Sequence, residues 1–215
     1  MLESIQIAMP YLLEGLKYTL IITVVGISLG CVIGTIFGLM RTSKSKILYG
    51  IASIYIELVR GTPMLAQIFF LHFGLPQLLG INLDKMLTAN IIIALNSGAY
   101  IAEIVRGGIE SVDKGQMEAG RSLGFNSSQT MRYIIWPQAL KLMIPPFGNQ
   151  FVISLKDTSL LSAIAVGELM YQGRQVASSN VIYFDVYLIV CVMYLMITIP
   201  ISLLLRRVER RLERS

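Results

Sequence analysis

Long apolar runs constrain this chain more than any other feature of its sequence. Five of them, at about 17–40, 47–72, 86–108, 137–157 and 181–205, are rich in apolar residues and poor in charge. A helix of about 20 residues crosses a hydrocarbon core roughly 30 Å thick, and each run reaches that length. Only 14% of the 215 residues are charged, against roughly 25% in an ordinary soluble domain. The sequence therefore predicts an all-α, polytopic membrane protein with five transmembrane helices in one domain, residues 1–215.

The basic residues are distributed unevenly between the two ends of these runs. If the runs cross a membrane in turn, Lys17, Lys85 and Arg174 lie on one side of it and twelve basic residues lie on the other side. Cytoplasmic segments carry the excess of Lys and Arg, which predicts an external amino terminus and a cytoplasmic carboxyl terminus. This placement explains the net charge of +5 without a nucleic acid partner. The twelve are Arg41, Lys44, Lys46, Arg106, Lys114, Arg121, Arg132, Arg206, Arg207, Arg210, Arg211 and Arg214.

The segment from Ile47 to Gly80 is too long for one straight span and too short for two. Its 34 residues would extend about 50 Å as one helix, at 1.5 Å per residue. We expect one span that breaks near Gly61-Thr62-Pro63, because proline disfavours helical backbone at the residue before it. An outer turn is expected at Gly74-Leu75-Pro76.

Glycines recur every four residues along the first run, at Gly26, Gly30, Gly34 and Gly38. Small residues at this spacing form a flat stripe on a helix, against which a second helix can pack closely. We expect this stripe to be a packing surface.

Polar residues on the third run form a second stripe. Asn96, Tyr100 and Glu103 are spaced i, i+4 and i+7, and Ser97 lies beside them. A carboxylate at membrane depth is costly unless it faces a cavity, a cation or a partner. We expect Asn96, Ser97 and Tyr100 to line a path for a polar ligand. Glu103 either faces that path or pairs with Arg106, three residues later.

The second run carries fewer candidates. Glu57 and Arg60 are three residues apart beside the expected break, which predicts a structural ion pair between them. His72 is the only histidine, so a bis-histidine haem site is excluded, and packing is its expected role. Cys31 and Cys191 lie in separate apolar runs, so the sequence predicts no metal site and no disulfide.

The fourth run contains Pro145-Pro146, which we expect to interrupt the helix at membrane depth, where only protein or water can satisfy the freed backbone groups. Asp157, Thr158 and Ser159 are residue types that cap helices. They predict a short re-entrant or interfacial helix that starts near Thr158, whose amino-terminal N–H groups meet an anionic group of a ligand. Asn149 lies eight residues before Asp157 and is expected on the same face. The alternative is that Asp157 only caps this helix and pairs with Lys156.

A polar segment at about 109–136 separates the third and fourth runs, and we expect it to form two short helices. Gly124 would end the first in a left-handed turn. Asn126 or Ser127 would cap the second, and Pro137 suits the first turn of the next span. We expect the first helix to contact a soluble partner through five residues: Glu118, Ala119, Gly120, Leu123 and Gly124. An ordinary amphipathic helix at the membrane interface is the alternative.

The same segment resembles a known signature. Glu118-Ala-Gly120, Gly124 and Ile134-Ile-Trp-Pro137 are similar to the E-A-A…G…I-x-L-P pattern of bacterial ABC importer permeases. Gly120 stands where that pattern usually has Ala, and Trp136 where it has Leu. Segments 57–63, 96–108 and 155–160 also resemble the polar-amino-acid subgroup of these permeases, in the expected order.

The resemblance implies the type I ABC importer permease fold in the inner membrane of a bacterium. It implies a dimer with a second copy or a related permease, two cytoplasmic ATP-binding cassette subunits and an extracytoplasmic amino-acid-binding protein. By that resemblance the Glu118–Gly124 helix couples the chain to the ATPase. ATP and Mg would bind only to the partner, because the chain has no G-x-x-x-x-G-K-[ST] phosphate loop. No residue is expected to be catalytic, and the chain is not expected to be an enzyme.

The function expected from the resemblance is ATP-driven uptake of a polar amino acid by alternating access. Glu103 and Asp157, if both face the path, would favour a basic amino acid such as arginine, lysine or histidine. An ion-coupled secondary amino-acid carrier is the alternative, which explains acids and broken helices without an ATPase but gives the polar segment no role. A membrane anchor of a redox complex would lack cofactor ligands.

Overall fold

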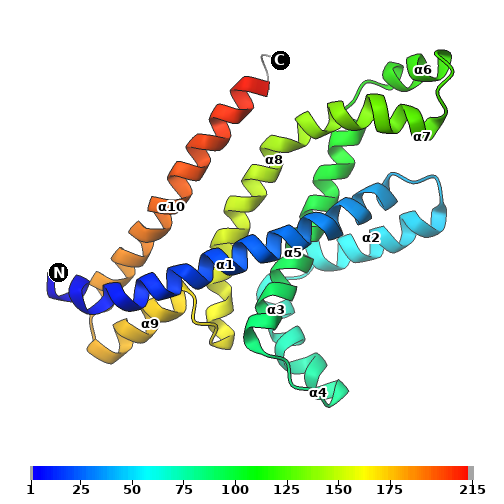
Figure 1. The fold of residues 1–215 in the computed structure, drawn as a ribbon. Helices are drawn as coiled ribbons and strands as arrows, with labels where there is room; N and C mark the ends of the chain where they lie inside the picture. The colour runs from blue at the N-terminus through cyan, green and yellow to red at the C-terminus, as the bar shows by residue number, and fades with distance from the viewer. Residues whose placement is uncertain (1, 213–215) are drawn as a thin grey trace.

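The computed structural model describes residues 2–212, and all regular structure in this part of the chain is helical. The long helices are α1 (Leu2–Arg41), α5 (Lys85–Glu110), α8 (Trp136–Asp157) and α10 (Tyr183–Leu212). The shorter ones are α2 (Lys46–Arg60), α3 (Met64–Phe69), the π-helix η1 (Phe70–Gly74), α4 (Leu75–Leu79), α6 (Lys114–Ser122), α7 (Ser127–Thr130), the π-helix η2 (Met131–Ile135), the 3-10 helix η3 (Thr158–Ile164) and α9 (Leu169–Asn180). In Figure 1 the α6–α7 hairpin and the carboxyl end of α10 lie at one end of the molecule, and α4 and α9 lie at the other.

Three of the described helices, α1, α5 and α10, are long and apolar enough to cross a membrane. A fourth span results if α2 and the α3–α4 segment count as one, and these two are bent by 103°. The 22-residue helix α8 is the remaining predicted span, and its composition is more polar, with Lys141, Asn149 and Gln150 among its residues. The count of five spans therefore stays a prediction.

The break between α2 and α3 lies where the sequence predicts it. Gly61 ends α2 and Pro63 precedes α3. A broken helix leaves carbonyls without their helical donors. The side chain of Gln67 supplies them, because its Nε2 donates to the carbonyl oxygens of Val59 at 2.7 Å and Thr62 at 3.1 Å.

The outer turn predicted at Gly74-Leu75-Pro76 is wrong. The chain stays helical through η1 and α4, and it turns at Gly80, whose φ of +66° is left-handed. Pro76 follows the π-helix η1, where the hydrogen bonds already depart from the α-helical pattern. Glycine at the end of the helix adopts the left-handed conformation at little cost.

The interruption predicted at Pro145-Pro146 is also wrong, since α8 continues through both prolines from Trp136 to Asp157. The carbonyls that lose a donor belong to the residues four positions earlier. These are Lys141 and Leu142, both exposed, so the missing bonds are on the outer face of the helix.

No separate capped helix begins at Thr158. The 3-10 helix η3 follows α8 directly, and the N–H of Thr158 already bonds the carbonyls of Ser154 and Lys156. Asp157 makes no side-chain capping bond. The expected anion site at a free helix amino terminus is therefore wrong, because α8 itself provides the acceptors. The chain ends η3 in a left-handed residue, Ala165.

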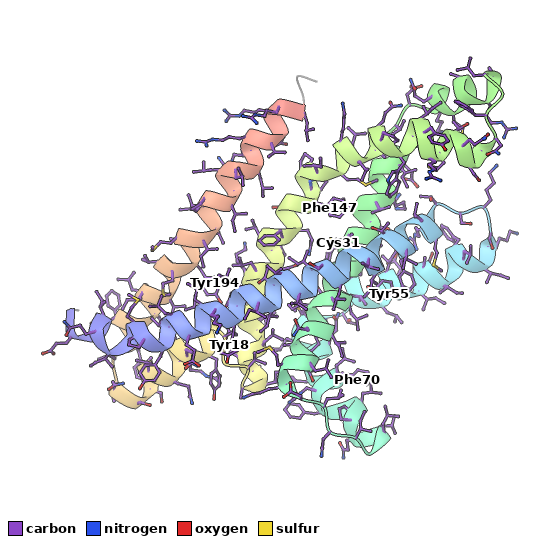
Figure 2. All side chains as sticks on the ribbon, in the orientation of Figure 1. Tyr18, Cys31, Tyr55, Phe70, Phe147 and Tyr194 are labelled. Carbon is purple, nitrogen blue, oxygen red and sulfur yellow. The ribbon has the colours of Figure 1, made fainter. Side chains whose placement is uncertain are left out.

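The glycine stripe on α1 packs against α5, as predicted. A Cβ placed at Gly26, Gly34 or Gly38 would lie 2.7, 2.6 and 2.6 Å from the Cβ atoms of Ile93, Ile101 and Val105, respectively. The residue numbers of the contacting positions increase in the same direction along α1 and α5, so the two helices run parallel. Helix α5 also packs against α2 and α8. Cys31 of α1 and Phe147 of α8 contact the same apolar cluster (Figure 2).

Candidate functional site

The polar segment forms a compact hairpin of two helices. Asp113 caps α6 by accepting from the N–H of Gly115 at 2.7 Å, and Gly124 ends it at φ +88°. Asn126 and Gln129 form a reciprocal capping box at α7, with both bonds at 2.9 Å. The predictions for Gly124 and Asn126 are confirmed, because both depend on local hydrogen bonding alone.

From α7 the helical backbone continues without interruption through η2 into α8. The helix α6 is attached to this long element by close packing at Gly120. A Cβ there would lie 2.5 Å from Thr130 Cγ2 and 2.9 Å from Ile134 Cδ1. Helix α6 therefore packs directly on the helical segment that leads into α8.

Gly120 was expected on the face that α6 presents to a partner, and that expectation is wrong. The residue is buried against α7 and η2, because the helical period turns it away from Glu118 and Ala119. Those two residues are exposed, and the side chain of Leu123 is exposed at the end of the helix. Among the predicted contact residues, Glu118, Ala119 and Leu123 have side chains exposed on or beside α6, and these three are called its free face.

Glu103 is the centre of an ion network that joins three helices. Its carboxylate lies 2.9 Å from the guanidinium of Arg106, 3.4 Å from that of Arg60 and 4.0 Å from that of Arg41. The Glu103–Arg106 pair anticipated as an alternative is therefore present. Arg41 ends α1, Arg60 ends α2, and Glu103 belongs to α5. The network fixes the ends of α1 and α2 to α5 beside the break.

The ion pair predicted between Glu57 and Arg60 is wrong. Glu57 instead contacts Arg41 at 3.3 Å, and Arg60 contacts Glu103 at 3.4 Å. The Glu103 side chain is 19% exposed and the Glu57 side chain 70% exposed. The more buried carboxylate gains more from an additional cation, because water screens it less.

The rest of the α5 stripe divides between core and surface. Asn96 is buried and donates to Gln67 Oε1 at 3.4 Å. Ser97 is buried against α1 and donates to the carbonyl of Ile93 at 2.6 Å. Tyr100 is 38% exposed, and the guanidinium carbon of Arg60 lies 5.5 Å from its ring centre. Of the predicted path residues on this helix, Tyr100 is the one that is exposed.

The predicted path residues of α8 and η3 face another part of the molecule. Asn149 lines a cavity of about 380 Å³ whose walls come from α8 and α10. Ser159 lines a second one, about 390 Å³, that also includes Tyr194 of α10. Thr158 is buried and donates to the carbonyl of Leu155, and Asp157 is half-buried. Within one chain, these residues and the α5 stripe do not form a common site.

Glu168 is a buried acid that the sequence analysis missed. Its carboxylate caps α9 by accepting from the N–H groups of Met170 at 2.8 Å and Tyr171 at 2.7 Å. It also accepts from the hydroxyl of Tyr194 at 3.3 Å, a residue labelled on α10 in Figure 2. Burial raises the pKa of the Glu168 carboxyl to about 7, and these hydrogen bonds oppose the rise. The sequence feature that could have revealed Glu168 is a single acidic residue directly before an amphipathic segment.

Comparison with known proteins gives the family. Residues 26–214 match the family described as binding-protein-dependent transport system inner membrane component. The chain belongs to this family. Its predicted fold class, an all-helical type I ABC importer permease, is thereby confirmed, and so is its place in a membrane.

Two relatives match nearly the whole chain. The glutamine transport system permease protein GlnP of Escherichia coli strain K12 is 45% identical over 207 residues, which cover 96% of this chain and 94% of that protein. The probable glutamine ABC transporter permease protein GlnM of Bacillus subtilis is 42% identical, with 94% of each chain covered.

A solved structure of an amino acid ABC transporter with histidines contains a similar chain. The TM-score is 0.90 at 39% sequence identity, and 94% of each chain is covered. A chain of the MetNI methionine ABC transporter in an inward-facing conformation has a TM-score of 0.80 at 21% identity, which shows the shared fold alone.

Proposed function

We propose that this chain is the membrane-spanning permease subunit of an ATP-driven amino-acid importer. The observation that carries the proposal is 45% identity with a glutamine permease over 96% of this chain. The exposed α6 face, Glu118, Ala119 and Leu123, contacts a cytoplasmic ATP-binding cassette subunit that binds ATP and Mg. An extracytoplasmic binding protein delivers the amino acid, and a second copy of the chain or a related permease completes the path.

The coupling mechanism follows from the hairpin. Closure of the ATPase dimer displaces α6, and the tight packing of Gly120 on Thr130 and Ile134 passes the displacement to α7. Because α7, η2 and α8 form one continuous helical segment, the displacement tilts α8 in the bilayer. Alternate tilting in the two permeases opens the path outward and then inward.

Glutamine is the first substrate to test. The preference for basic amino acids depended on negative charge from Glu103 and Asp157 along the path. Glu103 is surrounded by the guanidinium groups of Arg41, Arg60 and Arg106, so it offers no unpaired negative charge to a cationic substrate. Basic amino acids remain the second candidates, supported by Asp157 and by 34% identity with the arginine transport system permease protein ArtQ of Bacillus subtilis.

Reconstitution tests the assignment. The chain is purified with its ATP-binding subunits and placed in liposomes, and the binding protein is added outside with glutamine, arginine or glutamate. We expect uptake and stimulated ATP hydrolysis to require all components and to be highest with glutamine. Uptake by the chain alone, without ATP, would refute the proposal and support the ion-coupled carrier.

The orientation in the membrane is tested separately. In a variant without Cys31 and Cys191, single cysteines replace Leu123 on the hairpin and Asn82 in the loop before α5. We expect an impermeant maleimide to label Asn82→Cys in intact cells and Leu123→Cys only in inverted vesicles. The opposite pattern would place the amino terminus in the cytoplasm and disprove the proposed coupling.

A further inference from the structure

A cleft of about 780 Å³ lies between the turn after α1 and the α6–α7 hairpin. Figure 1 shows this turn and the hairpin on the same side of the molecule. Its walls come from the end of α1, the following turn, α6, α7, η2 and the first residue of α8.

The cleft is basic. Lys44 comes from the turn, Arg121 from α6 and Arg132 from η2, and no acidic residue lines it among the described residues. Arg121 is held in place because its Nη1 donates to Ser127 Oγ at 2.8 Å. The guanidinium carbon of Arg132 lies 5.7 Å from the ring centre of Tyr133. Three cations from three segments therefore converge on one opening.

The remaining walls combine apolar side chains with the hydroxyl groups of Thr42, Ser43, Ser127 and Ser128. Leu39, Met117, Met131 and Trp136 line the cleft beside the three cations. Leu39 belongs to the last turn of α1, whose apolar span ends at Arg41, and Trp136 begins α8. Tryptophan and basic residues at the ends of spans mark the boundary between lipid and water. The cleft thus opens at the depth of the lipid headgroups and offers both a cationic and an apolar surface.

We propose that this cleft binds an anionic phospholipid. The phosphate lies among Lys44, Arg121 and Arg132, and an acyl chain contacts Leu39 and Trp136. Basic pockets on the cytoplasmic side of membrane proteins bind anionic headgroups in this way. The bound lipid bridges the α1–α2 turn and the hairpin, and it stabilises α6 relative to the bilayer. The free face of α6, Glu118, Ala119 and Leu123, takes no part.

Native mass spectrometry of the purified full-length chain tests the proposal, with phosphatidylglycerol and phosphatidylcholine as probes. The test variant is K44Q/R121Q/R132Q. The matched control, R207Q/R210Q/R211Q, removes the same charge from exposed positions on α10. Each basic residue near a lipid headgroup contributes about fivefold in affinity. We expect the test variant to lose at least about tenfold in affinity for phosphatidylglycerol, with phosphatidylcholine unaffected and the control unchanged.

Further arms distinguish the other possible occupants. Inorganic phosphate at millimolar concentration should leave phosphatidylglycerol bound, and displacement would show a site for soluble anions instead. The lipid should also remain when the ATP-binding subunits are added, and its loss would assign the cleft to that protein interface. Equal binding by the test variant, or equal loss in the control, would overturn the proposal. Equal thermal stability of the two variants shows that the test variant folds.

Discussion

The close packing of α1 against α5 at Gly34 gives the sharpest quantitative prediction. In Gly34→Ala, the added methyl group would lie 2.6 Å from Ile101 Cβ and 2.7 Å from the carbonyl oxygen of Gly98. Neither is the end of a flexible side chain, so the helices α1 and α5 have to separate. Overpacking of this kind costs about 1–3 kcal/mol, and the rigid backbone contact favours the upper end.

The higher helix propensity of alanine offsets about 1 kcal/mol of this cost, which leaves a net destabilisation of about 2 kcal/mol. For a chain of this length the melting temperature should fall by about 4–8 °C, at 2–4 °C per kcal/mol. The matched control is Gly107→Ala on α5, where an added Cβ meets nothing within 4 Å. It gains propensity without a clash and should melt at or slightly above the wild-type temperature.

Thermal unfolding of both variants in the same detergent, followed by intrinsic fluorescence, provides the measurement. Gly34→Val should be destabilised further than Gly34→Ala, because its two additional methyl groups enlarge the clash. If Gly34→Ala melts at the same temperature as Gly107→Ala, then α1 and α5 do not pack at the spacing described here.

Three further predictions concern polar and turn residues. Glu103→Gln leaves the guanidinium groups around it without their shared anion, so the free energy of unfolding, measured by thermal unfolding, should fall by about 2–3 kcal/mol. The more exposed Glu110→Gln should lower it by less than about 1 kcal/mol, and equal losses would contradict the network. The pKa of Glu168 is raised from 4.5 to about 7 in the folded protein, so folding stability should decrease by up to about 3 kcal/mol as pH rises from about 4.5 to about 7. Glu168→Gln should flatten this pH dependence, and an unchanged dependence would exclude Glu168 as its source. Gly124→Ala places a Cβ at φ +88° at a cost of about 1–2 kcal/mol, and ligand-stimulated ATP hydrolysis of the assembled transporter should fall while membrane insertion is retained; full stimulation would argue against coupling through the hairpin.

The ion network also explains how a broken span is held in a membrane. The bend of 103° between α2 and α3 exposes carbonyls, which Gln67 satisfies, and it brings Arg60 against Glu103 and Tyr100. The hydroxyl of Tyr55 adds a bond from α2 to the carbonyl of Leu95 on α5, at 2.6 Å. Because Gln67 of α3 also accepts from Asn96 of α5 at 3.4 Å, the bend is fixed by contacts to α5 on both sides of the break.

Short-range patterns in the sequence determine much of the architecture. The apolar runs, the break before Pro63, the left-handed Gly124 and a helix cap at Asn126 or Ser127 were all predicted from residues within a few positions of one another. The glycine spacing on α1 likewise identified a packing face, because four-residue periodicity alone places those glycines together. Such features depend on backbone hydrogen bonds and side-chain size, which neighbouring residues determine.

Partners distant in the sequence were decided only by tertiary structure. The sequence placed Arg60 beside Glu57, but the crossing of α2 and α5 brings it to Glu103. Whether Gly120 faces a partner or packs on α7 and η2, and whether Glu168 is buried, depends on which helices pack around them. The residues Asn96 and Asn149 were expected along one path, yet α5 and α8 turn them toward different neighbours. A one-dimensional pattern gives the face of each helix, whereas the rotation of that face toward a particular neighbour comes from the packing of the whole bundle.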